Sequence, residues 1–228
     1  MNKPAWILCC IGMTLLPSWI LGCAVLSRNI GAPPNEDYAL LERQVEAVLD
    51  YVEGKVSTLT LVDFSQHEPQ WRIWSFGVND TGNAPTPDKL KEAEEFIAAV
   101  QGIRASYEPL EAYKACRAVG EDNRDFVALR DCEYLRQPGV KNQAQQIISQ
   151  ENKGRKALHK RTAIFFKALD ISVGLVEQLY ALKRLERAES GAIAQLPQAG
   201  AAFEDFRLSA KGQALGPLCI PESWVTLR

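Results

Sequence analysis

The two histidines, His67 and His159, are the side chains best suited to proton transfer near neutral pH. A nucleophilic hydrolase would need one of them beside a nucleophile and an acid, and the sequence contains no Gly-x-Ser-x-Gly turn to present a serine. His67 precedes Glu68 without a second histidine at metal-ligand spacing. His159 lies in a basic run, which predicts a solvated or half-packed residue. We therefore predict no catalytic residue, metal or cofactor, and keep a hydrolase as a less favoured alternative.

Cys23 is the cysteine whose surroundings suggest a modification. It lies in a segment without charged side chains that runs from Pro4 to Ser27, and the leader within that segment closes with Ile20-Leu21-Gly22-Cys23. One basic residue, an apolar core and small residues are typical of an export signal. The last four residues resemble the lipobox of bacterial lipoproteins, in which the leader is removed before the cysteine and the cysteine receives lipid. By the same resemblance, Ala24 in place of an aspartate favours the outer membrane.

An uncleaved membrane helix is an alternative interpretation of this segment, because its 24 residues from Pro4 to Ser27 can span a bilayer about 30 Å thick. Plain secretion is a second alternative. All three interpretations place residues 28–228 outside the cytoplasm, at or near a membrane surface.

Cysteines beyond the leader allow a second kind of chemistry. Cys116 and Cys132 could form a disulfide in an oxidising compartment, which would contribute about 3 kcal/mol on the chain-entropy model. Cys219 would then remain unpaired. Three buried thiols are the alternative, and the absence of a Cys-x-x-Cys pair gives no support for a redox or zinc site.

Charge is distributed unevenly along the chain. The formal net charge of −2 argues against a nucleic-acid partner. Residues 35–53 are mainly acidic and residues 153–187 mainly basic, so these regions could pack on each other, or the basic one could contact anionic lipid or remain solvated. The candidate lipid contacts are Arg155, Lys156, Lys160 and Arg161. Glu151 and Arg155 are spaced i, i+4, which favours an exposed pair or, if semi-buried, one that joins two helices.

Apolar spacing predicts a mainly α protein, organised as a small helical bundle. One helix follows Asn35 and ends at Gly54, and a second begins at Thr86-Pro87-Asp88 with a kink or break at Pro109. A third covers about 142–169, with a possible break at Gly154, and a fourth follows Ser172 and ends at Ser190-Gly191.

Two regions lack the helical period. Residues 56–77 predict short strands or extended segments, in which Trp71, Trp74 and Phe76 form either core or an exposed patch for a partner. Residues 197–228 are rich in glycine and proline and predict an irregular tail.

A resemblance to a known family lies between Lys114 and Gln195. Lys114-Ala-Cys-Arg-Ala-Val-Gly-Glu121 is followed by Phe126-Val-Ala-Leu129, then by Glu151-Asn152 with Arg155, and finally by Arg187-Ala188 with Gly191. This order resembles the YdbL-like family of uncharacterised bacterial envelope proteins. Arg124-Asp125 replaces the family's Asn-Gly, and His159 replaces its tyrosine. The resemblance implies an envelope accessory role, with a link to lipid transport between membranes, and carries no catalytic residue.

These features together predict an envelope lipoprotein on the periplasmic face of the outer membrane, acting as a non-catalytic adaptor for an envelope protein partner. A lipid or small-ligand carrier is the alternative, and it would need a continuous apolar cavity where an adaptor has a closed core. The expected organisation is a signal peptide (1–22), lipidated cysteine and tether (23–34), an N-terminal helical region with short strands (35–113), a YdbL-like helical region (114–196) and an irregular tail (197–228).

Overall fold

The structure is a computed structural model that describes residues 36–59, 87–165 and 171–228. Several predicted features lie outside these residues: the leader with Cys23, the first histidine and the aromatic segment (His67, Trp71, Trp74, Phe76). The described part of the predicted strand region, residues 56–59, contains no strand.

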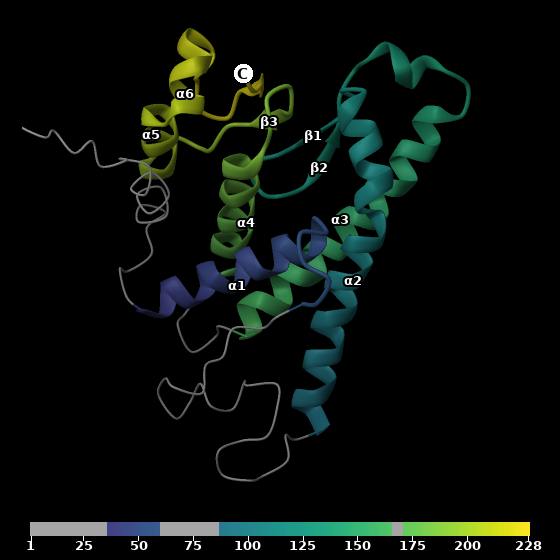
Figure 1. Cartoon of the computed structure of the whole chain (residues 1–228), viewed down its shortest axis with the longest axis vertical. Coiled ribbons are helices and arrows are strands. Elements are labelled where there is room, and N and C mark those ends of the chain that lie inside the picture. Colours follow the sequence, from purple (N-terminus) through teal and green to yellow (C-terminus); the bar gives the residue numbers. More distant parts are fainter. Residues whose placement is uncertain (1–35, 60–86, 166–170) are drawn as a thin grey trace, which may run out of the picture.

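The chain is mainly helical, as its apolar spacing predicts, and it also forms a small four-stranded sheet (Figure 1). The longer helices are α1 (Glu36–Val52), α2 (Pro87–Ala115), α3 (Val140–Phe165) and α4 (Val173–Arg187). The shorter ones are α5 (Ala201–Leu208), α6 (Ala210–Leu215) and the 3-10 turns η3 (Glu133–Arg136) and η5 (Gly216–Leu218). The strands are β1 (Val119–Glu121), β2 (Val127–Leu129), β3 (Ile193–Gln195) and β4 (Trp224–Thr226).

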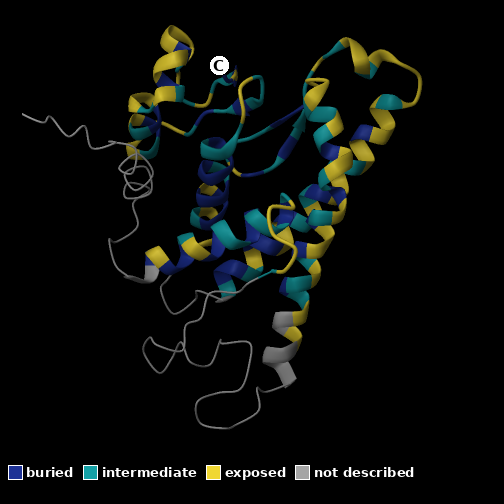
Figure 2. Ribbon diagram, viewed as in Figure 1, coloured by how far each residue is buried: buried dark blue, intermediate teal, exposed yellow. Residues whose placement is uncertain are grey.

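The main core lies where α1, α2, α3 and α4 meet. α1 contributes an apolar stripe at helical spacing, and the inward faces of these helices are buried (Figure 2). Gly54 lies just beyond the end of α1, and its φ of 74° is a left-handed conformation that glycine adopts without strain. The core members with the least exposure are Leu41, Val45, Val48, Leu49, Val100, Leu158, Val176, Leu179 and Tyr180.

α2 and α3 form a long antiparallel pair, and neither helix breaks where the sequence suggested (Figure 1). Pro109 lies inside α2 and is exposed, so water can reach the carbonyl that its missing N–H leaves unbonded. Gly154 lies inside α3, where an added Cβ would be 3.0 Å from Cγ1 of Ile103 in α2. The glycine therefore permits a close approach of the two helices, and the predicted break is wrong.

The sheet joins the ends of α2 and α4, with strand order β2-β1-β3-β4. β1 pairs with β2 in antiparallel fashion and with β3 in parallel fashion, and β3 pairs with β4 in antiparallel fashion. Asn152 of α3 covers the outer edge of β2, because its side chain accepts a hydrogen bond from Val127 N at 2.8 Å and donates one to Val127 O at 2.9 Å. This side chain satisfies an edge that would otherwise be open to another strand.

The prediction of an irregular C-terminal tail is wrong, because residues 197–228 contain α5, α6, η5 and β4. Glycines at 200 and 216 have positive φ and join these short elements. Apolar residues of the region form a second core with Leu185, Ala194 and Leu196: Phe203, Phe206, Leu215, Val225 and Leu227. Helices of six and eight residues are too short to show a clear helical period in the sequence.

Within 36–59, 87–165 and 171–228, no helix combines the length and the apolar character needed to cross a membrane.

Candidate functional site

Charged side chains from α2, β1, the β1–β2 loop, α3 and α4 meet in the interior, and Arg155 of α3 lies at the centre. Arg155 is 1% exposed and its Nε donates to Oε1 of Glu151 at 2.7 Å. Its guanidinium also donates to both carboxylate oxygens of Glu121, with Nη2 3.1 Å from Oε1. A further hydrogen bond runs from Nη1 to the backbone oxygen of Asp125 at 2.9 Å. We call these groups, with Lys114, His159 and Arg184, the buried ion network.

Asp125 connects the β1–β2 loop to both α3 and α4. Its Oδ1 accepts a hydrogen bond from Arg184 Nε at 2.6 Å, and its Oδ2 lies 2.9 Å from His159 Nε2. The loop is shaped by Asp122, whose Oδ1 accepts hydrogen bonds from the backbone N–H groups of Arg124 at 2.9 Å and Phe126 at 2.7 Å. Asp125 itself has φ of 66°, a conformation that aspartate adopts more readily than most residues. This turn directs its carboxylate into the network.

The lysine and arginine side chains of the buried ion network equal its carboxylates in number. Its carboxylates are Glu121, Asp125 and Glu151, and its cations are Lys114, Arg155 and Arg184. A buried charge is tolerated only when an opposite charge and hydrogen bonds replace its hydration, and each of these groups has such a partner.

The network sets the ionisation of its acids. Burial by itself would raise the pKa of Asp125, but Arg184, Arg155 and His159 together hold it below its usual value. Burial acts on Glu121 in the same way, and Arg155, Lys114 and Arg184 hold its pKa well below the ordinary range. The three carboxylates in turn raise the pKa of Arg155 against the effect of burial. The ion pairs therefore persist throughout the neutral pH range.

Two sequence interpretations need correction here. Glu151 and Arg155 are 2% and 1% exposed, so the preferred surface pair is wrong and the alternative, a pair that joins helices, describes them. Ser106 of α2 donates a hydrogen bond to Glu151, which makes the connection between α2 and α3 direct. His159 is 0% exposed and not a solvated residue.

The proposed lipid-contact residues occupy three different environments. Arg155 is buried and cannot reach a headgroup, whereas Lys156 and Lys160 are exposed on α3. Arg161 is partly buried and forms an ion pair with Glu95 of α2.

α1 and α4 use their opposite charges to bind each other, which confirms the intramolecular interpretation for this pair. Arg187 of α4 pairs with Glu46, with Asp50 at 2.8 Å and with Glu53 at 3.1 Å. Lys183 adds contacts with α1, including one to Glu46 at 3.3 Å.

Cys23, the proposed lipid-attachment site, lies outside the described residues, whereas the three cysteines beyond the leader lie within them. Cys116, Cys132 and Cys219 are free thiols, so the possible Cys116–Cys132 disulfide is not formed in this structure. The alternative of three buried thiols is wrong as well, because Cys116 is exposed and the other two are partly exposed. Among the described residues no cluster of His, Cys, Asp and Glu is placed to hold a metal ion.

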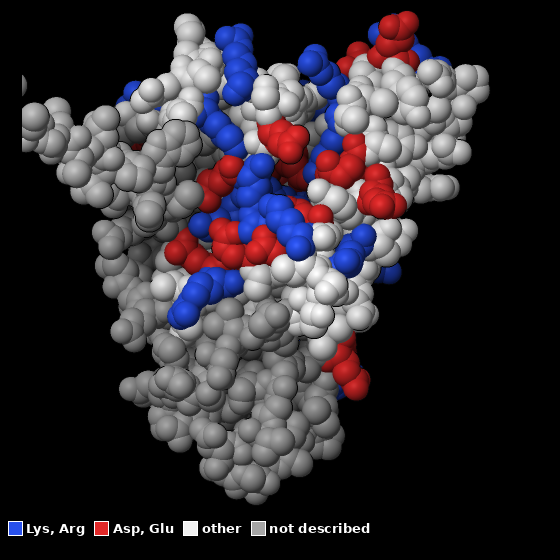
Figure 3. All heavy atoms as spheres, viewed as in Figure 1, with Lys and Arg blue, Asp and Glu red and all other residues white. Residues whose placement is uncertain are grey.

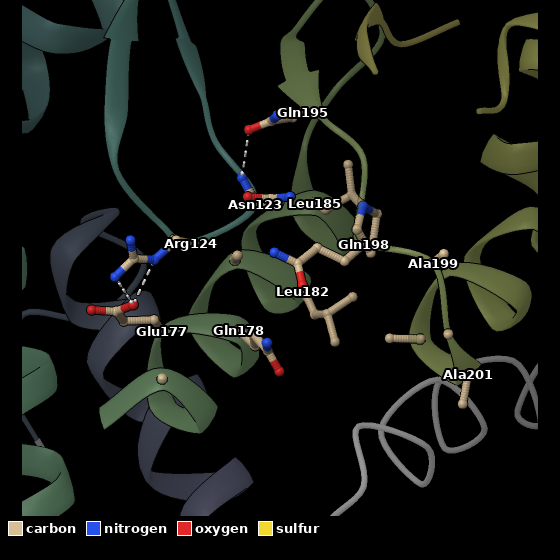
Figure 4. A pocket seen from close by; sticks show the side chains of 15 residues that line it. Asn123, Arg124, Glu177, Gln178, Leu182, Leu185, Gln195, Gln198, Ala199 and Ala201 are labelled. Carbon is tan, nitrogen blue, oxygen red and sulfur yellow. Dashed lines mark hydrogen bonds and ion pairs between the residues drawn. The ribbon is translucent and has the colours of Figure 1, made fainter. Parts of the chain in front are cut away.

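Two concave surfaces flank the network. The first, which we call the amide groove, has a volume of about 340 Å³ and lies between α4 and the segment that leads into α5 (Figure 4). An ion pair between Arg124 and Glu177, at 2.7 Å, lies at one side of it. Gln178 of α4 and Gln198 are exposed in the groove, over the apolar side chain of Leu182.

The second concave surface, which we call the charged cleft, has a volume of about 520 Å³ and lies between the C-terminal ends of α2 and α4. Figure 3 shows Lys and Arg atoms gathered at this face with Asp and Glu atoms around them. Lys114, Glu121 and Arg184 of the buried ion network form part of its wall.

No protein-family model, curated protein or solved structure matches the chain. Membership of the YdbL-like family therefore stays a prediction based on the residues between 114 and 195.

Sequence reasoning identified Glu151, Arg155 and His159 separately but did not place them together with Asp125 and Arg184. One signal was available: positions 151, 155, 159 and 162 repeat every three or four residues, so polar side chains share one helix face with Leu158. A polar stripe beside an apolar core residue indicates a buried network. The partners from the β1–β2 loop and α4 have no comparable signal in the sequence.

Proposed function

We propose that this protein is an envelope lipoprotein, attached through Cys23 to the periplasmic face of the outer membrane, that acts as a non-catalytic adaptor for an envelope assembly. The leader supports the attachment, and the YdbL-like pattern of residues 114–195 supports the accessory role.

The observation that carries the adaptor role is the network of ion pairs that joins the helices to the sheet. Arg155 and Asp125 join the loop between the strands to α3 and α4, so the body that would present a binding surface is held by several elements at once. Rigid elements position a binding surface more accurately than loops do.

The alternative carrier function receives less support. A lipid carrier needs a continuous apolar cavity, and the amide groove and the charged cleft both include charged or amide side chains in their walls. An enzyme receives little support from His159, because it and Asp125 are both 0% exposed and therefore closed to a substrate.

The amide groove is the candidate contact surface for a protein partner. The side-chain amides of Gln178 and Gln198 can each donate and accept hydrogen bonds, and neither amide has a hydrogen-bond partner within the described part of the chain. Free amides above an apolar floor suit an extended segment of another protein, because its backbone also offers both donors and acceptors. We expect such a segment to bind along α4.

Affinity capture of the full chain from detergent-solubilised membranes tests this function, with mass spectrometry of both co-purifying proteins and lipids. The wild type is expected to retain a protein that Gln178→Arg loses and that Gln146→Arg, a matched change on an exposed part of α3, retains. Recovery of neither protein nor lipid with the wild type would contradict both the adaptor and the carrier.

The membrane attachment has its own test. Cys23→Ser is expected to abolish labelling of the protein by a fatty-acid precursor, because the thiol is the proposed acceptor. Labelling that survives the substitution would refute the assignment. Exposed Lys156 and Lys160 could add contacts to anionic headgroups once the chain is anchored.

A further inference from the structure

The charged cleft contains hydrogen-bond donors that are not bound by the acidic residues of its own wall. Glu121 already binds Lys114 at 2.7 Å as well as Arg155, and Arg187 is held by acids of α1. Two guanidinium groups in the wall remain available, those of Arg117 at the end of α2 and Arg184 on α4.

Arg184 has a buried donor without an acceptor. Its side chain is 7% exposed and its Nε is bonded to Asp125 at 2.6 Å, but its Nη2 is buried and has no hydrogen-bond partner among the described residues. A buried guanidinium N–H without an acceptor is costly, because folding removes its water without replacing it. Nη1 of the same group also has no partner there and is not among the buried atoms, so it is the nitrogen that an acceptor in the cleft would bind.

Arg117 occupies a backbone position that glycine would fill with less strain. The N–H of Arg117 bonds to the carbonyl of Lys114 at 2.8 Å and that of Ala118 to the carbonyl of Tyr113 at 2.9 Å, which is the Schellman pattern at the end of a helix. Arg117 is the left-handed residue of this motif, with φ of 58°. A non-glycine residue in such strain points to a use for its side chain.

The guanidinium of Arg117 has no ion pair or hydrogen bond within the described ranges, and the residue is exposed in the cleft wall. Glu189, also exposed, is an acid of the same wall without a partner cation among the described residues. Glu111 is bound by Lys114 at 2.9 Å and Glu53 by Lys55 at 2.7 Å. Asp122 is occupied by the backbone N–H groups of the β1–β2 loop.

We propose that the charged cleft binds a phosphate group between Arg117 and Arg184. Guanidinium groups recognise oxyanions through paired N–H donors. The two arginines come from different helices, so one ligand must accept hydrogen bonds from two directions. A tetrahedral phosphate presents oxygens outside a single plane, so it can accept from both guanidinium groups, and its charge exceeds that of a carboxylate. The phosphate belongs either to a small soluble compound or to a lipid headgroup.

Arg117→Gly separates this role from a purely structural one. The substitution relieves the left-handed strain, so we expect it to raise the unfolding temperature by about 2–4 °C. The same substitution removes a phosphate ligand, so we expect phosphate affinity to fall by about tenfold or more. Arg117→Ala should lose the affinity without the gain in stability, and Arg136→Ala, which removes an exposed arginine outside the cleft, should change neither.

Binding is measured with the full chain in neutral detergent, by titration with inorganic phosphate and with glycerophosphoglycerol, the soluble headgroup of phosphatidylglycerol, so that the anchor does not mask the cleft. Binding of inorganic phosphate that depends on Arg117 indicates a soluble ligand, and Arg117-dependent binding of the headgroup without it indicates a lipid; either supports the site. Glu189→Gln should tighten binding in the responding assay, because it removes an opposing charge from the wall. The proposal is overturned if Arg117→Gly leaves binding unchanged in both assays, or if the wild type binds neither probe.

Discussion

Replacing Arg155 by methionine is the most direct test of the buried ion network. Methionine keeps much of the side-chain length and removes the charge together with the hydrogen bonds to Glu121, Glu151 and Asp125. Glu121 and Asp125 retain Lys114 and Arg184, but Glu151 retains only the hydroxyl of Ser106. The variant therefore leaves one buried carboxylate without a cation.

The expected cost is about 3–5 kcal/mol, the usual effect of removing one partner from a buried ion pair. An exposed pair contributes only about 0–1 kcal/mol, so the magnitude distinguishes a buried pair from a surface pair. Because domains are typically stable by about 5–15 kcal/mol, Arg155→Met should shift the whole unfolding transition.

Urea unfolding of the full chain in mild detergent, followed by circular dichroism, measures this cost. Lys156→Met changes the neighbouring exposed residue and should alter stability by less than about 0.5 kcal/mol. Adding Glu151→Gln to Arg155→Met should recover part of the loss, with a coupling energy of about 0.5–3 kcal/mol. A cost below about 1 kcal/mol for Arg155→Met, equal to that of Lys156→Met, would refute the buried network.

Other predictions address the loop, a helix end and two glycines. The pKa of Asp125 is lowered in the folded state, so its ionised form stabilises the fold. The wild type should therefore lose its stability advantage over Asp125→Asn only below about pH 4, by up to about 1.4 kcal/mol per pH unit. A difference in the free energy of urea unfolding that stays constant down to about pH 2 would contradict this. Lys211 Nζ donates to three carbonyls at the end of α4, including that of Ala188 at 2.7 Å. Lys211→Met should therefore lower the free energy of unfolding, measured by thermal unfolding, by about 1.5–3 kcal/mol. A loss below about 0.5 kcal/mol would show that these hydrogen bonds contribute little. Gly120→Ala should destabilise by about 1–3 kcal/mol, because its Cβ would lie 2.8 Å from the Trp224 ring, whereas Gly102→Ala, which meets no atom within 4 Å, should stabilise by about 0.5–1 kcal/mol. Unfolding shifts of the same sign in these two variants would contradict the packing argument.

The role of Gly120 illustrates why local sequence signals were incomplete. Glycine often marks a turn, but this one lies in β1 beside Ile193 and Trp224, and the absence of a side chain is what that contact requires. Nothing near Gly120 in the sequence indicates that residues more than 70 positions later will lie against it.

Helices α1 to α4 were determined largely by the sequence itself, because apolar residues at helical spacing and local end signals lie within the segments they describe. Ser172 is an example: it was predicted to cap α4, and its hydroxyl accepts a hydrogen bond from Leu175 N at 3.1 Å. The strands, the folded C-terminal region and the burial of Arg155 were decided only by tertiary structure. Three-residue strands carry too little periodicity to be recognised, and an arginine looks the same in the sequence whether it faces water or three carboxylates. Its environment is set by Asp125 and Arg184, which are distant along the chain and meet it only when the helices pack.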